Sequence, residues 1–115
     1  MVQTLNAPIY RTTTETNIAP VSLELLYLFE NTPITGSDYV LNHGLMTEVE
    51  VFKDGVIIRC NYIDEESYGK RPDIAYNDFI TSIRDRYNSL NRRKNRLSQH
   101  DQSILERLQV LLGQK

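Results

Sequence analysis

Five basic residues close together in the second half of the chain are the strongest sign of chemistry in this sequence. They are Arg86, Arg92, Arg93, Lys94 and Arg96, all within the basic segment 84–96. Guanidinium and ammonium groups bind phosphate oxygens and carboxylates, so the cluster could hold a nucleic-acid backbone, a phosphorylated ligand or an acidic protein surface. The simpler interpretation is a solvated helix face, with cations near a helix C-terminus where the dipole favours them. No motif that reads bases accompanies the cluster.

A second candidate site surrounds His43, which lies between two glycines together with Asp38 and Tyr39. An imidazole beside a carboxylate could transfer protons or bind a small ligand, although a lone histidine in a loop is more often ordinary polar surface. The sequence has no phosphate-binding glycine loop, no nucleophile elbow and no zinc-ligand spacing. It therefore predicts no metal, no cofactor and no catalytic residues, and it leans away from an enzyme.

Length and composition predict one globular domain. The chain has 115 residues, 40% of them hydrophobic, enough for a single core. Cys60 is the only cysteine, which excludes an intramolecular disulfide and fits a reducing compartment. The sequence contains neither an apolar run of ~20 residues nor a secretory signal, so we expect a cytoplasmic location and no membrane partner.

Charge is distributed unevenly along the chain. Residues 1–66 carry ten acids and three bases, a net −7, whereas residues 67–115 carry five acids and ten bases, a net +5. Opposite signs in the two halves indicate attraction within the fold, between subunits of a homo-oligomer, or toward an anionic partner.

A β-hairpin over about 47–63 is the element around which the fold is predicted to form. Asp54-Gly55 is typical of a type I′ turn between alternating apolar residues. That turn would place Glu50 opposite Arg59 and Val51 opposite Ile58. One face of the hairpin then carries Val49, Val51, Val56, Ile58 and Cys60, so we expect Cys60 to be a buried packing residue rather than a reactive thiol.

Two helices are predicted to follow the hairpin. The first begins at an Asp73 cap and ends by about Arg93, because Lys94 would break its apolar stripe. That stripe consists of Tyr76, Phe79, Ile80, Ile83, Tyr87 and Leu90. The second begins at a Ser98–Asp101 capping box and stops at Gly113. Its apolar face consists of Ile104, Leu105, Leu108, Leu111 and Leu112.

The remaining segments are assigned from weaker patterns. Residues 1–20 are predicted to be a flexible N-terminal arm. Residues 21–31 alternate like a strand, yet their Leu and Glu content and the preceding Pro20 favour a helix, and we predict a helix. Residues 35–44 form a loop or a short strand, and residues 64–72 form a long loop.

These elements predict an α+β fold for a single domain over residues 21–115. A small antiparallel sheet built on the hairpin is covered by a C-terminal helical hairpin. For function, the first hypothesis is a small non-enzymatic regulatory, adaptor or inhibitor protein that acts through protein–protein interaction, with self-association. The alternatives are a nucleic-acid-binding protein that uses the basic segment, and a ligand-binding protein or enzyme with a site near His43.

Overall fold

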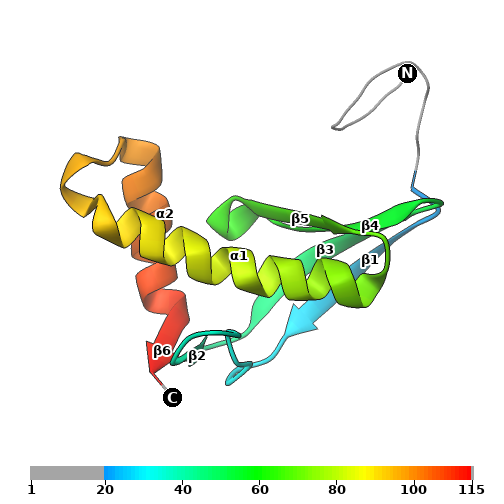
Figure 1. Cartoon of the computed structure of the whole chain (residues 1–115), viewed down its shortest axis with the longest axis horizontal. Coiled ribbons are helices and arrows are strands. Elements are labelled where there is room, and N and C mark those ends of the chain that lie inside the picture. Colours follow the sequence, from blue (N-terminus) through cyan, green and yellow to red (C-terminus); the bar gives the residue numbers. More distant parts are fainter. Residues whose placement is uncertain (1–19, 115) are drawn as a thin grey trace.

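A computed structural model describes residues 20–114, in which six strands and two long helices follow one another (Figure 1). The strands are β1 (Ser22–Leu28), β2 (Tyr39–Leu41), β3 (Leu45–Phe52), β4 (Gly55–Cys60), β5 (Glu65–Gly69) and β6 (Leu112–Gln114). The helices are α1 (Pro72–Arg92) and α2 (Gln99–Leu111), with short 3₁₀ turns η1 (Asn61–Ile63) and η2 (Lys94–Arg96). This order confirms the predicted α+β class. Apart from Pro20, the predicted arm lies outside the described residues.

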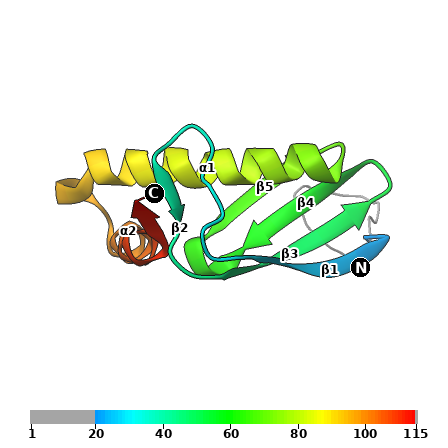
Figure 2. The same ribbon diagram turned by 90° about the horizontal axis from the view of Figure 1, so that it is seen from below.

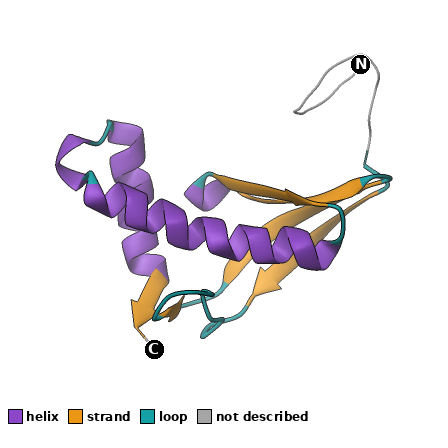
Figure 3. Ribbon diagram, viewed as in Figure 1, coloured by secondary structure: helices purple, strands orange, loops and turns teal. Residues whose placement is uncertain are grey.

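The main sheet is antiparallel, with the strand order β1-β3-β4-β5, and β2 and β6 form a separate two-stranded sheet. Helix α1 runs along one face of the main sheet (Figure 2). Helix α2 lies across the far end of α1, where it contacts η1 and β6 (Figure 3). The core between these layers is apolar, and within the described residues no helix has the length and apolar character needed to cross a membrane.

The hairpin is present, but its turn lies one residue earlier than predicted. Val51 pairs with Val56 rather than with Ile58, so the turn residues are Lys53 and Asp54. Neither has a positive φ, which excludes the predicted type I′ turn. Each residue of β3 thus pairs with a residue of β4 two positions from the predicted one. Because side chains alternate with a period of two, they keep their predicted faces, and Val56, Ile58 and Cys60 are buried.

Gly55 has a steric role instead of a conformational one. It is buried at the start of β4, where a Cβ atom would lie 2.5 Å from the ring of Tyr68. The Tyr68 hydroxyl donates to the Asp54 carbonyl at 3.0 Å, which fixes the ring over this position. The Asp-Gly pair therefore predicts the hairpin correctly, but Gly55 makes room for the Tyr68 ring and does not supply a positive φ.

Helix α1 confirms the predicted apolar stripe and corrects its start. Its N-cap is Arg71, which makes no side-chain cap, and Pro72 occupies the first helical position. Asp73 is not the cap, because it lies inside the first turn and accepts from Arg71 at 3.1 Å. The stripe residues Phe79, Ile80, Ile83 and Leu90 are buried, Tyr76 and Tyr87 are half-buried, and the helix ends at Arg92 as expected.

Helix α2 begins as predicted and ends early. The Ser98 Oγ accepts from the backbone N–H of Asp101 at 3.1 Å, as a capping residue should. The helix stops at Leu111 instead of Gly113, because Leu112–Gln114 become β6 and pair with Tyr39–Leu41 of β2. The buried face of α2 therefore packs within its own subunit.

Two further segments differ from prediction. Residues 21–31 are not a helix: Ser22–Leu28 form β1, because pairing with β3 outweighs the helical preference of Leu and Glu. Residues 64–72 are not a loop throughout, since Glu65–Gly69 form β5. The sequence of β5 does not show apolar alternation, because its buried positions are Ser67 and Gly69. The buried Ser67 hydroxyl donates to the Ala75 carbonyl at 2.8 Å.

Candidate protein-interaction surface

The face of the main sheet opposite α1 carries a row of exposed apolar side chains, which we call the β1 stripe. Its members are Leu23, Leu25, Tyr27, Phe29 and Met46. Leu25 and Phe29 are 68% and 69% exposed, values that are unusual for large apolar side chains in such a small domain. Met46 pairs directly with Tyr27, whose ring meets that of Phe29 edge-on at 5.1 Å. The stripe is thus contiguous.

The stripe lies outside the core because of strand alternation. Leu26 and Leu28 point toward α1, so Leu23, Leu25 and Tyr27 must point to the opposite face. Among the described residues no element covers that face. A sheet with only one covered face normally has polar residues on the other, and β1 does not follow this rule.

On the same face the central strands carry an ion-pair network beside the half-buried Phe52 and Ile57. Arg59 lies 3.1 Å from Glu50 and 3.0 Å from Glu66, and this ion-pair network crosses β3, β4 and β5. The predicted Glu50–Arg59 contact is therefore present, although the two residues are diagonal neighbours rather than directly opposite. Most of the exposed large apolar side chains on the open face therefore lie on or beside β1, and Tyr68 of β5 is the exception.

Strand β1 is also an edge of the sheet, with β3 as its only strand neighbour among the described residues. The Leu26 carbonyl faces β3, where it accepts from the Thr47 hydroxyl at 2.9 Å. Because consecutive residues alternate the direction of their backbone polar groups, Leu23, Leu25 and Tyr27 present their N–H and C=O groups to the free edge.

The two edges of the sheet differ in character. The opposite edge, β5, has the sequence Glu-Glu-Ser-Tyr-Gly and packs against α1. Natural edge strands are commonly protected by charges, proline or bulges. Strand β1 holds one charge, Glu24, and its side chain is on the α1 side. The β1 edge thus combines free backbone groups with an apolar stripe.

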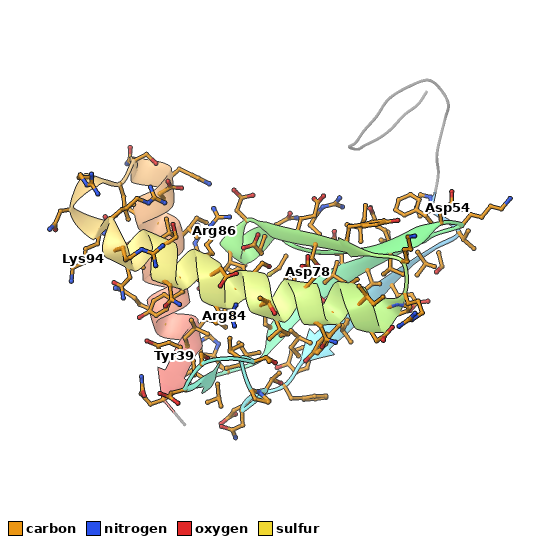
Figure 4. All side chains as sticks on the ribbon, in the orientation of Figure 1. Tyr39, Asp54, Asp78, Arg84, Arg86 and Lys94 are labelled. Carbon is orange, nitrogen blue, oxygen red and sulfur yellow. The ribbon has the colours of Figure 1, made fainter. Side chains whose placement is uncertain are left out.

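The basic segment lies at the opposite end of the molecule from the hairpin turn, as Lys94 and Asp54 show in Figure 4. Arg92, Arg93, Lys94 and Arg96 are all exposed around the end of α1 and η2. Asn88, Asn91, Arg92 and Lys94 line a shallow hollow of about 340 Å³ there. Four of the five predicted binding residues are therefore close together on the surface.

Arg86 does not belong to that surface group. Its Nη1 atom donates to the Asp64 carbonyl at 2.9 Å and lies 3.9 Å from a Glu65 oxygen. Asp64 has a positive φ of 53° and its carboxylate lies 3.0 Å from the His100 Nε2. Part of the charge asymmetry along the chain is thus used within the fold, where Asp64 and Glu65 of the acidic half contact Arg86 of α1.

Burial raises the pKa of Glu65 above its ordinary value of 4.5, and the nearby Arg86 only partly opposes this shift. A raised pKa means that folding favours the protonated carboxyl. Its contribution to stability is present below pH 4.5 and is lost as the pH rises through the folded-state pKa.

We expect Glu65→Gln to remove this pH dependence, because the amide does not titrate. Urea unfolding across the acidic range should show the variant gaining stability relative to wild type as the pH rises past 4.5, then a constant difference. Parallel pH profiles for the two proteins would contradict the burial of this carboxyl.

The residues of the His43 hypothesis have different surroundings in the structure. His43 and Asp38 are exposed, and none of the hydrogen bonds among residues 20–114 joins His43 to Asp38 or Tyr39. Tyr39 instead packs edge-on against Tyr87 at 5.3 Å, and burial raises the pKa of Tyr87. The same residue range contains no group of three His, Cys, Asp or Glu side chains that could hold a metal ion.

Cys60 is buried, as predicted. Its Sγ donates to the Met46 carbonyl at 3.6 Å, and burial raises the pKa of the thiol. Both properties keep the thiol protonated and unreactive.

The β1 stripe was not among the predicted site residues. Its one sequence signal is the strand-like alternation of Leu23, Leu25, Tyr27 and Phe29, against which the Leu and Glu content of the segment favours a helix. Comparison with known protein families, with curated proteins and with solved structures found no match to this chain.

Proposed function

We propose that this protein is a small non-enzymatic regulatory or adaptor protein that binds a protein partner along β1. The partner contributes an extended segment that pairs with the free edge and lays its own apolar side chains beside the β1 stripe. The observation that carries the proposal is the 63–69% exposure of Leu23, Leu25 and Phe29, beside an edge that no strand among residues 20–114 pairs with.

Strand addition suits this surface for two reasons. The backbone groups of an added strand would satisfy those of Leu23, Leu25 and Tyr27, which supplies affinity. Alternate side chains of the added strand would fall on the face of the stripe, where cross-strand apolar pairs add roughly 0.2–1 kcal/mol each. A partner segment with apolar residues at every second position is therefore preferred.

A displayed library of random peptides, each about as long as β1, tests the proposal. The protein is immobilised at low density so that copies do not meet. We expect selection of peptides with alternating apolar residues, and loss of their binding in Leu25→Lys. Val110→Lys is the matched control, because Val110 is also an exposed aliphatic residue, 57% exposed against 68% for Leu25, and lies on α2, outside β1. Equal retention of the selected peptides by both variants would overturn the proposal.

Nucleic-acid binding is the competing proposal, supported by the exposure of Arg92, Arg93, Lys94 and Arg96 around a hollow. The variant Arg92→Ala/Arg93→Ala/Arg96→Ala separates the two proposals. If the basic segment is the functional site, wild type shifts single- and double-stranded nucleic acid at low salt and the triple variant does not. If β1 is the site, the triple variant retains all binding to the selected peptides.

A further inference from the structure

We propose that the protein partner at β1 is a second copy of this chain, joined by antiparallel pairing of β1 with β1 about a twofold axis at Leu25. This inference rests on the proposed function, since it names the occupant of the same edge. The two main sheets would form one continuous eight-stranded sheet. Both copies of α1 would then lie on the same face of that sheet.

The backbone of β1 favours this register. Leu23, Leu25 and Tyr27 present their polar groups to the free edge, so these residues must form the hydrogen-bonded pairs of any added antiparallel strand. An axis at Leu25 pairs Leu25 with its own copy and Leu23 with the partner's Tyr27. Every outward N–H and C=O of these three residues then finds a partner, and none is left unpaired at the centre of the junction.

The side chains of β1 are self-complementary in the same register. On the open face, Leu25 meets Leu25 and Leu23 meets Tyr27, so only apolar groups face one another across the axis. The charge of Glu24 lies on the α1 side, where Leu26 of the other copy is directly opposite. Like charges directly opposite each other would be unfavourable, and this register avoids them.

The second edge of the sheet explains why the assembly would close as a dimer. Strand β5 is polar, and the positions after it are Lys70, Arg71 and Pro72, which disfavour strand addition. Within residues 20–114 each chain therefore offers one edge that can accept a strand. Pairing of two such edges by a twofold axis uses the same surface on both copies and leaves none free for a third.

Light scattering coupled to size exclusion over a range of protein concentrations is the first test. We expect the mass of wild type to rise from one chain to two chains. The variant Leu25→Lys places two lysines directly opposite each other at the axis, so its dimer dissociation constant should rise at least about tenfold. Val110→Lys adds the same charge away from β1 and should dimerise like wild type. Circular dichroism spectra should be the same for all three proteins, because Leu25 and Val110 are exposed.

A charge-swap pair tests the register itself. Mixing a Leu23→Lys chain with a Tyr27→Glu chain should produce heterodimers more stable than either homodimer, since the introduced charges face each other only when Leu23 is opposite Tyr27. No preference for the heterodimer would overturn the register.

Amide hydrogen exchange of the full chain identifies any other occupant. In the proposed dimer, protection of the Leu23, Leu25 and Tyr27 amides rises with protein concentration. Protection that does not depend on concentration, in a monomer, would assign the edge to residues 1–19 of the same chain and overturn the dimer. A monomer whose edge amides exchange rapidly would also overturn it. Peptide binding that depends on Leu25 would still support the proposed function in that last case.

Discussion

Replacing Phe79 by Ala is expected to lower the free energy of unfolding by about 3–5 kcal/mol, the usual cost of removing a buried aromatic side chain. Phe79 is the largest fully buried side chain, with 0% exposure, and lies in the middle of α1 where the helix covers the sheet. Since small domains are stable by only about 5–15 kcal/mol, this single change brings the protein near the limit of folding.

This loss is measured by urea denaturation followed by circular dichroism. It appears as a lower urea concentration at the midpoint, while the dependence of the unfolding free energy on urea concentration is unchanged. Ile74→Ala is the matched control on the same helix, because Ile74 is 41% exposed and should cost less than about 1 kcal/mol. If Phe79→Ala does not fold, Phe79→Leu keeps most of the volume and should still show a reduced midpoint. A loss below about 1 kcal/mol in Phe79→Ala would contradict the packing of α1 on the sheet.

Gly69→Ala is expected to cost about 2–3 kcal/mol, in the upper part of the range for adding atoms to a packed site. The glycine lies at the end of β5, beneath the first turn of α1. A Cβ atom there would come within 3 Å of backbone atoms of Ile74 and Ala75, which cannot rotate away as a side chain could. The Ser67 hydroxyl, bonded to the Ala75 carbonyl, holds the same turn against the strand.

Gly113→Ala is the comparison for this prediction. Its new Cβ would meet the side chain of Asn42, which is exposed and can move, so we expect a change within about 0.5 kcal/mol. Thermal or urea unfolding of both variants gives the difference. Equal stabilities of the two variants would mean that α1 can move away from β5 without cost.

The long helices could be predicted because each has a full apolar face and a clear end. Phe79 and Ile83 repeat at helical spacing, and Lys94 interrupts the repeat where the core ends. The faces of the hairpin were also correct, since they depend only on alternation. Its register was not, because the turn consists of Lys53 and Asp54 and Gly55 is the first residue of β4.

Strands β1 and β5 could not be predicted because in neither strand do the apolar side chains mark the buried face. In β5 the buried residues are Ser67 and Gly69, which carry no apolar signal. In β1 the residues Leu23 and Leu25 are apolar and exposed, which reverses the usual pattern. The candidate site follows from that reversal, so it became visible only when the position of α1 identified the covered face.

The pairing of β2 with β6 has a consequence for the timing of folding during synthesis. Val40 pairs with Gly113, 73 residues later in the chain. At about 5–20 residues per second, the ribosome needs roughly 4–15 s to add that length. Over this interval the buried Leu41 has no partner strand, whereas the hairpin of β3 and β4 is complete once Cys60 has been added, 20 residues after Val40. A nascent chain of this protein therefore exposes apolar surface around β2 until β6 emerges, and chaperones have several seconds in which to bind it.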